Sequence, residues 1–531
     1  MRLDKEVILF IGLGLFLNSY AINWGLPNVN DWTNLSLAPL KPLSYAAHIL
    51  SREPWPYHYP PLHTILLAIA YSPYVGLLMM NGGLYSPIET YPYGLTNPEL
   101  SLSVFTLIAR FVSVVMGLGI SITNYYSIRK FYDKKAALFA GLLLTTSYPI
   151  IHYSHNANVD IPQLFWFSLS LYSFVYLIDE GRTKYYMMLG LFAALAFTTK
   201  ESIYAAFIGM AAVIIWVQFL RGYKSKSSLA YGLKNIIDTR TVYGLIIFGI
   251  VSLLIFNPVI NWDGLIFHVR RHALRSVHGS WVIRDASSSL NGHVELIFYY
   301  VIYIFESSGP LIFVLLMGGL IYCFIKSPRR SLILILPIIS YYTFFLRIHG
   351  THQLRYMLPI YLVLFWFAGK LSADLLRSRA VIKFTFLAFI LVSLCHSLLY
   401  GFSVNTMYVN DPRYHAERWI AKNIKAGSVV LAVEPDYSLP RLPKDLIVVK
   451  RDLWDFHGNL IDDIKDIPGD YVILGMSIPR RRERREDIAE FFRNNNFQEI
   501  ASFQERLPFL VGEIANLHIL SPRIIILRNI R

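Results

Sequence analysis

Cysteine and charge are both scarce in this 531-residue chain. Its two cysteines, Cys323 and Cys395, lie in apolar runs, so neither a disulfide framework nor a cysteine-based zinc site is available. Charged residues make up only 16% of the chain, against roughly 25% in soluble globular proteins. Hydrophobic residues make up 54%. These proportions exclude an ordinary soluble enzyme and predict a membrane protein.

Basic residues outnumber acidic ones by 49 to 35, which gives a net charge of +14. Residues 1–400 carry 30 basic and 17 acidic side chains (+13), whereas residues 401–531 carry 19 and 18 (+1). In the first part the excess is concentrated in short loops between apolar segments, as in the cytoplasmic loops of membrane proteins. The charge therefore indicates orientation, and we predict no nucleic-acid partner. We interpret residues 1–400 as an intramembrane domain and residues 401–531 as a small soluble domain.

Eleven apolar segments are candidates for transmembrane helices, each of which needs ~20 mostly apolar residues. They lie near residues 6–24, 102–124, 136–151, 161–179, 185–200, 202–220, 242–260, 309–325, 331–346, 356–369 and 384–400. With the basic loops inside, the N-terminus is cytoplasmic and the odd number of spans puts the C-terminal domain outside the plasma membrane. Segments 62–80 and 293–306 would break this alternation, so we interpret them as interfacial or re-entrant helices.

Short apolar runs alternate with helical patterns in the C-terminal domain. A helix is predicted from Asp411-Pro412 to Lys425, and a charged helix over residues 481–494. Strands are predicted at 429–433, 446–449, 471–474, and near 497–503 and 523–527. The fold class is therefore a polytopic α-helical membrane protein with about eleven transmembrane helices and a C-terminal extracytoplasmic α/β domain.

Ionisable side chains gather at the outer ends of the predicted spans, whereas a transporter would place some at mid-membrane. Asp31 lies in the long first outer loop, and Asp160 lies directly before a span. An Asx-turn or a helix N-cap would account for these carboxylates about as well as a catalytic role. His152 and His155 accompany Asp160, but their spacing matches no specific metal-ligand pattern. We predict no cofactor and no metal ligand, and a divalent metal stays an open alternative.

Several bases lie on the outer side, against the rule that this side is poor in them. They are Lys200, Arg270, Arg271, Arg275 and Arg355. Lys200 lies between two apolar spans and must pair, reach water or bind an anion, and Glu201 beside it is the simplest partner. As a group, the bases favour an anionic ligand such as a lipid phosphate, with anchoring to lipid headgroups as the alternative.

Five motifs follow one another in roughly the first 370 residues. They are Asp31 in a long outer loop, His58-Tyr59-Pro60-Pro61-Leu62, Ser154 to Asp160 before a span, Thr199-Lys200 at a span end, and Arg355-Tyr356-Met357-Leu358-Pro359. Their order and spacing resemble those of the GT-C membrane glycosyltransferases, in the branch of protein O-mannosyltransferases and lipid A aminoarabinose transferases. The family often has Asp-Glu where this chain has Asp31-Trp32.

The resemblance implies an inverting transfer of a hexose or pentose from a polyprenyl-phosphate donor to a protein, lipid or glycan acceptor outside the cytosol. Asp31 would be the base, Asp160 would assist it, and Lys200 and Arg355 would hold the phosphate, with Arg270, Arg271 or Arg275 beside them. Substrate contacts are expected from His58, Tyr59, His155, Glu201, His352 and Tyr356. The alternative function is a transporter or flippase of a lipid-linked substrate, and membrane lipids are partners under either function.

Overall fold

The computed structural model describes most of the chain. The described residues are 4–27, 32, 39–51, 55, 59–86, 88, 91–234, 236, 238–273, 283, 286–378, 380–433, 438–451, 469–476, 490, 492–494, 496–505 and 522–530. The chain divides into two compact units, one of Met1–Ile22 with Leu37–Gly401 and one of Asn23–Ser36 with Phe402–Arg531. The second unit thus includes part of the first outer loop, which the sequence assigns to domain 1–400.

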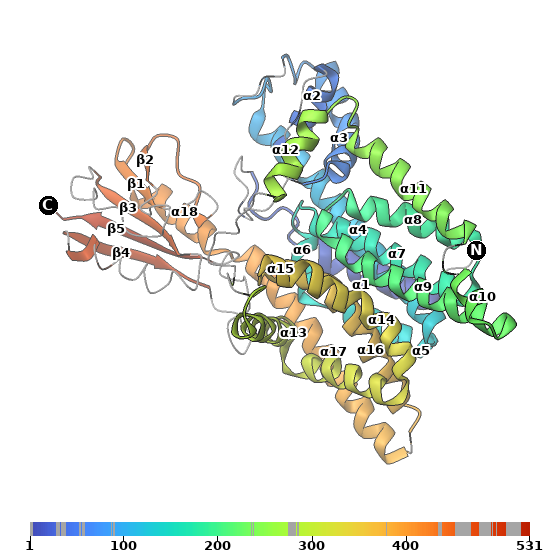
Figure 1. The fold of residues 1–531 in the computed structure, drawn as a ribbon. Helices are drawn as coiled ribbons and strands as arrows, with labels where there is room; N and C mark the ends of the chain where they lie inside the picture. The colour runs from blue at the N-terminus through green and yellow to red at the C-terminus, as the bar shows by residue number, and fades with distance from the viewer. Residues whose placement is uncertain are drawn as a thin grey trace. The chain divides into compact units, whose positions relative to one another are not determined.

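The first unit is built of helices, which Figure 1 shows in blue to orange. They are α1 (Lys5–Ser19), α2 (Leu40–Ser51), α3 (Leu62–Met80), α4 (Pro98–Phe131), α5 (Lys134–Thr145), α6 (Tyr148–Ser154), α7 (Asp160–Glu180), α8 (Thr183–Phe197), η1 (Glu201–Ile203), α9 (Tyr204–Lys226), α10 (Leu229–Lys234), α11 (Thr239–Phe256), α12 (Trp262–Ala273), α13 (Leu290–Lys326), α14 (Pro328–Tyr341), η2 (Tyr342–Leu346), α15 (Arg347–His349), η3 (Leu354–Met357), α16 (Leu358–Leu375) and most of α17 (Ala380–Val409).

Nine helices in the described residues are long and apolar enough to cross a membrane, or ten if the bent pair α5–α6 counts as one span. The polytopic α-helical class is therefore confirmed. The number differs from eleven because α1 and α8 have only 15 residues each, α5 and α6 meet at 53°, and α3 qualifies by length and composition. The interpretation of α3 (residues 62–80) as a helix that does not cross the membrane stays a prediction. Segments 293–306 and 309–325 are parts of one helix, α13, interrupted at Gly309 (φ 72°) before Pro310.

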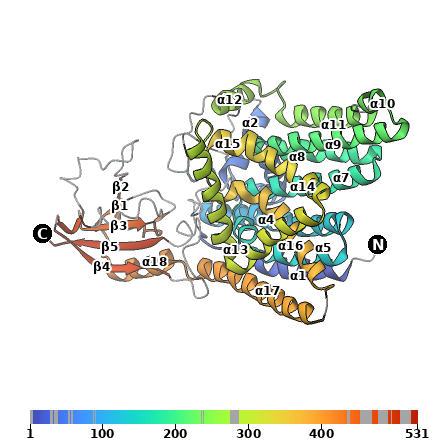
Figure 2. The same cartoon turned by 60° about the horizontal axis from the view of Figure 1, so that its bottom comes forward.

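The helices of the first unit pack through small residues where they approach most closely. Helix α7 packs against α4 and α8, and α16 packs against α5 and α13. In Figure 2, α8 and α11 run side by side. Gly190 of α8 faces Gly244 of α11, and a Cβ at Gly190 would lie 2.1 Å from the Gly244 carbonyl oxygen. Such contacts are typical of helix pairs in membranes, where small residues let backbones come together.

The second unit contains a five-stranded mixed sheet and helix α18 (Pro412–Asn423). The strands are β1 (Val429–Val433), β2 (Ile447–Arg451), β3 (Tyr471–Met476), β4 (Phe497–Phe503) and β5 (Arg523–Asn529). Their order is β2-β1-β3-β5-β4, with β1 parallel to β2 and β3, and β5 antiparallel to β3 and β4. All five predicted strands occur, and the α/β class of this part is confirmed. Of the predicted charged helix, residues 490 and 492–494 are described, and they are helical.

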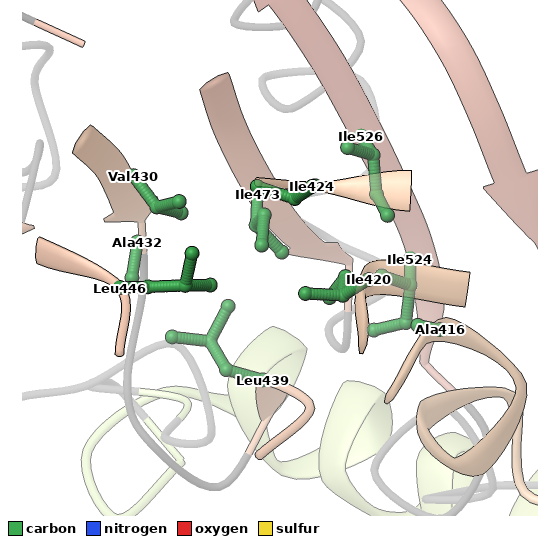
Figure 3. Close-up of a cluster of buried hydrophobic side chains, with 10 residues drawn as sticks. All are labelled: Ala416, Ile420, Ile424, Val430, Ala432, Leu439, Leu446, Ile473, Ile524 and Ile526. Carbon is green, nitrogen blue, oxygen red and sulfur yellow. The ribbon is translucent and has the colours of Figure 1, made fainter. Parts of the chain in front are cut away.

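Both faces of this sheet are apolar. On one face, Ala416, Ile420 and Ile424 from the α18 segment pack against strand residues such as Ile473 and Ile526, as Figure 3 shows. On the other face the cluster is Leu431, Val433, Val472, Leu474, Phe492, Phe497, Ile525 and Leu527. Because β1, β3 and β5 are buried on both faces, their sequences are continuous apolar runs rather than alternating ones.

Candidate active site

Three junctions between helices of the first unit carry the predicted charged residues. Asp160 is the first residue of α7, Lys200 lies between α8 and η1, and Arg355 lies in η3 at the start of α16. Antiparallel helices bring such junctions to one end of a bundle. Lys200 pairs with Asp160, and both Lys200 and Arg355 face the Tyr356 ring, so the three residues meet there. The three residues form the charged cluster described below.

An ion pair lies at the centre of the charged cluster. The Lys200 Nζ lies 2.6 Å from Asp160 Oδ1, and the two side chains are only 3% and 1% exposed. The second carboxylate oxygen accepts a hydrogen bond from Asn158 Nδ2 at 2.9 Å. Gln163 Nε2 donates to the backbone carbonyl of Lys200 at 2.7 Å, which holds this junction against α7. Both oxygens of Asp160 are thus engaged, and the lysine is held in a fixed position.

The two simpler explanations of these residues do not hold. Val159, not Asp160, occupies the N-cap position of α7, and no side chain caps that helix. Glu201 is not the partner of Lys200, since its carboxylate faces the His268 ring instead, with Oε2 3.9 Å from Nε2. The carboxylate of Asp160 therefore serves the ion pair rather than the helix end.

Arg355 is the second cation of the charged cluster. Its guanidinium carbon lies 5.0 Å from the centre of the Tyr356 ring, and Lys200 Nζ lies 4.1 Å from the same centre. The Tyr341 hydroxyl donates to the Tyr356 carbonyl at 3.1 Å and so holds this turn. The Nε and Nη1 atoms of Arg355 are buried, and the described residues offer them no hydrogen-bond partner. Buried donors of this kind are costly unless a ligand or water meets them.

Electrostatics keep Lys200 charged. Burial is the largest single influence and lowers the pKa of Lys200, but the Asp160 carboxylate together with the Tyr356 and Tyr59 phenols outweighs it, so the pKa lies above its usual value. Tyr59 also lies near both cations. Burial raises the pKa of the Tyr59 phenol, and the charges of Arg355 and Lys200 oppose that shift without reversing it. The site therefore presents two fixed cations and a neutral phenol.

Three predicted substrate contacts have other partners in the first unit. The ring nitrogens of His155 lie 2.8 Å and 2.7 Å from the carbonyls of Ile151 and Tyr20, which ties the end of α6 to the end of α1. His352 stacks on Tyr299, with ring centres 4.5 Å apart, and its Nδ1 lies 2.9 Å from a tyrosine hydroxyl. Glu201 faces His268, as described above. Only Tyr59 and Tyr356 of the described substrate-contact set join the charged cluster.

The remaining predicted residues fall on α12 or outside the described residues. Arg270 is exposed on α12, and Arg271 lies on the same helix. Asp31, His58 and Arg275 lie outside the described residues. In the described part of the chain, no group of three His, Cys, Asp or Glu side chains could hold a metal ion.

Asn158, Gln163 and Tyr341 belong to this site, and sequence reasoning missed all three. Gln163 carried a signal, because an amide one turn after Asp160 inside an apolar helix needs a polar neighbour. Asn158 also carried one, since it lies two residues before that carboxylate. Tyr341 carried no such signal, because its hydrogen-bond partner, the Tyr356 carbonyl, lies in a turn that only the packing of the helices brings near it.

A family model describes part of this chain. Residues 102–262 match the model of the dolichyl-phosphate-mannose-protein mannosyltransferases, a stretch that contains Asp160 and Lys200 but not Arg355. No curated protein matches the chain at a significant level. Over these residues the chain is similar to the protein O-mannosyltransferase branch of the GT-C glycosyltransferases. The resemblance predicted from the motifs is thus confirmed over this stretch.

Solved structures similar to this chain are distant in sequence. One is an oligosaccharyltransferase of Archaeoglobus fulgidus in complex with zinc and sulfate, with 14% identity and a TM-score of 0.47. The alignment covers 80% of this chain, which spans only 60% of that protein. Another is ArnT of Cupriavidus metallidurans bound to undecaprenyl phosphate, with 14% identity, a TM-score of 0.47, and coverage of 98% and 97%. A third is the S. cerevisiae protein O-mannosyltransferase Pmt1–Pmt2 complex, with 16% identity, a TM-score of 0.30, and coverage of 54% and 36%.

Proposed function

We propose that this protein transfers a sugar, with inversion, from a polyprenyl-phosphate donor to an acceptor on the extracytoplasmic face of the membrane. The observation that carries the proposal is Arg355, whose buried Nε and Nη1 lack hydrogen-bond partners among the described residues, beside a lysine fixed by Asp160. Two preorganised cations at the ends of membrane helices suit a phosphate whose lipid tail lies in the bilayer. The family model, named for a dolichyl-phosphate-sugar donor, supports the same donor class.

The chemistry follows from the charge that develops during transfer. An acceptor hydroxyl or amine attacks the anomeric carbon while a carboxylate takes up its proton, a role that we assign to Asp31. The bond from the anomeric carbon to the phosphate oxygen breaks, and the polyprenyl phosphate leaves with added negative charge. Lys200 and Arg355 stabilise that charge, and Asp160 keeps Lys200 aimed and protonated. Tyr59 and Tyr356 line the cations and can contact the sugar or the phosphate.

Arg270, Arg271 and Arg275 are proposed as outer contacts of the donor phosphate or of lipid headgroups, since the described Arg270 is exposed. The acceptor is a protein, lipid or glycan, and the protein lies in the plasma membrane with its N-terminus inside.

The test uses the purified full-length protein in liposomes with labelled polyprenyl-phosphate hexoses and pentoses and a membrane extract as acceptor. The wild type should release polyprenyl phosphate and label an acceptor. Arg355→Gln should lower transfer by about a hundredfold or more, because a donor to the departing oxygen is lost. Lys135→Gln removes an exposed base in the first turn of α5 and should retain the wild-type rate.

Two results would refute the proposal. One is transbilayer movement of the lipid-linked sugar with no transfer, which would identify a flippase. The other is transfer by Arg355→Gln at the wild-type rate.

A further inference from the structure

Three tyrosines of α13 hold the turn between α15 and η3, residues 350–353. The Tyr300 hydroxyl donates to the Thr351 carbonyl at 2.5 Å. The Tyr303 hydroxyl lies 2.9 Å from Nδ1 of His352, and the Tyr299 ring stacks on the same imidazole with ring centres 4.5 Å apart. Thr351 and His352 are both buried. We refer to Tyr299, Tyr300 and Tyr303 as the α13 tyrosines.

This turn leads directly into η3, which carries Arg355. The Tyr356 amide donates to the Gln353 carbonyl at 3.1 Å, and the Tyr356 carbonyl accepts from Tyr341 of α14, also at 3.1 Å. Nε and Nη1 of Arg355 are buried and have no hydrogen-bond partner in the described part of the chain. Lys200 is fixed by an ion pair at its charged end, whereas the described contacts fix Arg355 mainly through its backbone.

The part of α13 that carries these tyrosines is itself bonded to two neighbouring helices. The Tyr361 hydroxyl of α16 donates to two of its backbone carbonyls, at 3.0 Å and 3.2 Å. The Tyr400 hydroxyl of α17 donates to the Glu306 carbonyl, whose partner in a continuous helix would be the amide that Pro310 lacks. The Tyr400 hydroxyl thus takes the place of the missing bond. Because α16 follows η3 in the chain, the Tyr361 contact also ties the segment after Arg355 back to α13.

We propose that the α13 tyrosines and His352 are positioning residues of the transfer reaction, which fix this turn so that the Arg355 guanidinium meets the donor phosphate in one geometry. This inference rests on the proposed function above. Rings alone would fill the space beside the turn, whereas hydroxyl bonds to a carbonyl and to an imidazole nitrogen have defined directions and set its orientation. A displacement of about 1 Å at a reacting site can lower the rate by about a hundredfold. His352 then acts on the donor through Arg355 rather than by touching it.

The test removes single hydroxyl groups and leaves every ring in place. In the full-length protein in liposomes, Tyr300→Phe and Tyr303→Phe should each lower kcat/KM for a labelled polyprenyl-phosphate sugar by about tenfold, because the turn loses a directional bond. Tyr342→Phe is the matched control. Its hydroxyl makes a bond of the same kind, 2.8 Å from Nδ1 of His293, which does not involve the turn, so this variant should retain the wild-type rate.

A double-mutant cycle separates positioning from a general effect on stability. In an Arg355→Gln background, Tyr303→Phe should change kcat/KM by no more than about twofold, because its effect requires the Arg355 side chain. Binding of polyprenyl phosphate to the same four proteins should follow the same pattern. His352→Asn can keep a hydrogen bond near the position of Nδ1 and should retain more transfer than His352→Ala.

Equal losses from Tyr303→Phe with and without the Arg355 side chain would overturn the proposal, because they would indicate a merely structural tyrosine. Wild-type rates in both phenylalanine variants would overturn it as well. If Tyr300→Phe does not fold, because the buried Thr351 carbonyl has lost its donor, the half-buried Tyr303 decides. Absence of transfer in the wild type would instead refute the proposed function.

Discussion

At the residue scale, the charged cluster shows how a membrane protein keeps a lysine buried. Lys200 is almost fully covered, and its charge is balanced by Asp160 at 2.6 Å and faces the Tyr356 ring at 4.1 Å. Such a pair costs desolvation, so its stability comes from the fact that neither charge is left alone. Arg355, by contrast, has two buried nitrogens without a partner among the described residues. The difference agrees with the proposed roles, in which Asp160 holds Lys200 and Arg355 binds the donor phosphate.

We predict that stability requires Asp160 and Lys200 to be present together or absent together, whereas transfer requires each of the two residues. Asp160→Asn leaves a buried lysine unpaired and should destabilise the protein by about 3–5 kcal/mol. The double variant Asp160→Asn with Lys200→Met should recover much of that loss, because no charge remains buried. Transfer should stay low in both, because Lys200 loses the carboxylate that positions it in the single variant and is absent from the double variant. Unfolding in detergent and transfer assays measure the two effects, and a double variant as unstable as Asp160→Asn would contradict this account.

At the element scale, close approach of backbones fixes the helix packing. Helices α8 and α11 meet at Gly190 and Gly244, where any side chain at Gly190 would collide with a carbonyl oxygen. The interruption of α13 at Gly309 has a different cause, because Pro310 lacks the amide that a continuous helix needs. The sequence gives the glycines and the proline, but not which partner each one faces.

We predict that Gly190→Ala destabilises the protein by about 1–3 kcal/mol, because the added methyl group must push the two helix backbones apart. Gly249→Ala is the matched control on α11, since nothing lies within 4 Å of its Cβ position. That variant should be neutral or slightly stabilising, as alanine is a better helix former than glycine. Thermal unfolding in detergent measures both, and equal effects would show that the α8–α11 contact does not limit stability.

At the scale of the whole molecule, two units share the first outer loop. Residues Asn23–Ser36 belong with the C-terminal part, although the rest of the N-terminal half belongs to the helical unit. A domain assignment from composition could not show this, because the segment is polar like any outer loop. The consequence is that the described residues of this segment, Trp24, Gly25, Pro27 and Trp32, contact the C-terminal part of the same unit.

We predict an extracytoplasmic C-terminal unit and a non-crossing α3. In a variant without the two natural cysteines, single cysteines at Asn81 and Lys422 should react with an impermeant reagent added to intact cells. A cysteine at Lys135 should react only after permeabilisation, because the basic loop between α4 and α5 is cytoplasmic by the charge rule. All three positions are exposed. Reaction of the Asn81 cysteine only after permeabilisation would make α3 a transmembrane helix.

The sequence alone determined the membrane class and the α/β class of the C-terminal part, and it indicated the resemblance to the GT-C glycosyltransferases, because hydropathy, apolar runs and motif order are properties of the chain itself. It also proposed Asp160, Lys200, Arg355 and Tyr356, since charges at the ends of apolar segments are conspicuous. Only the tertiary structure decided that Asp160 rather than Glu201 pairs with Lys200, that His155 binds carbonyls, and that Trp32 lies against Arg413 and Arg441. The reason is physical, because these pairings join segments up to several hundred residues apart, and only packing brings them into contact.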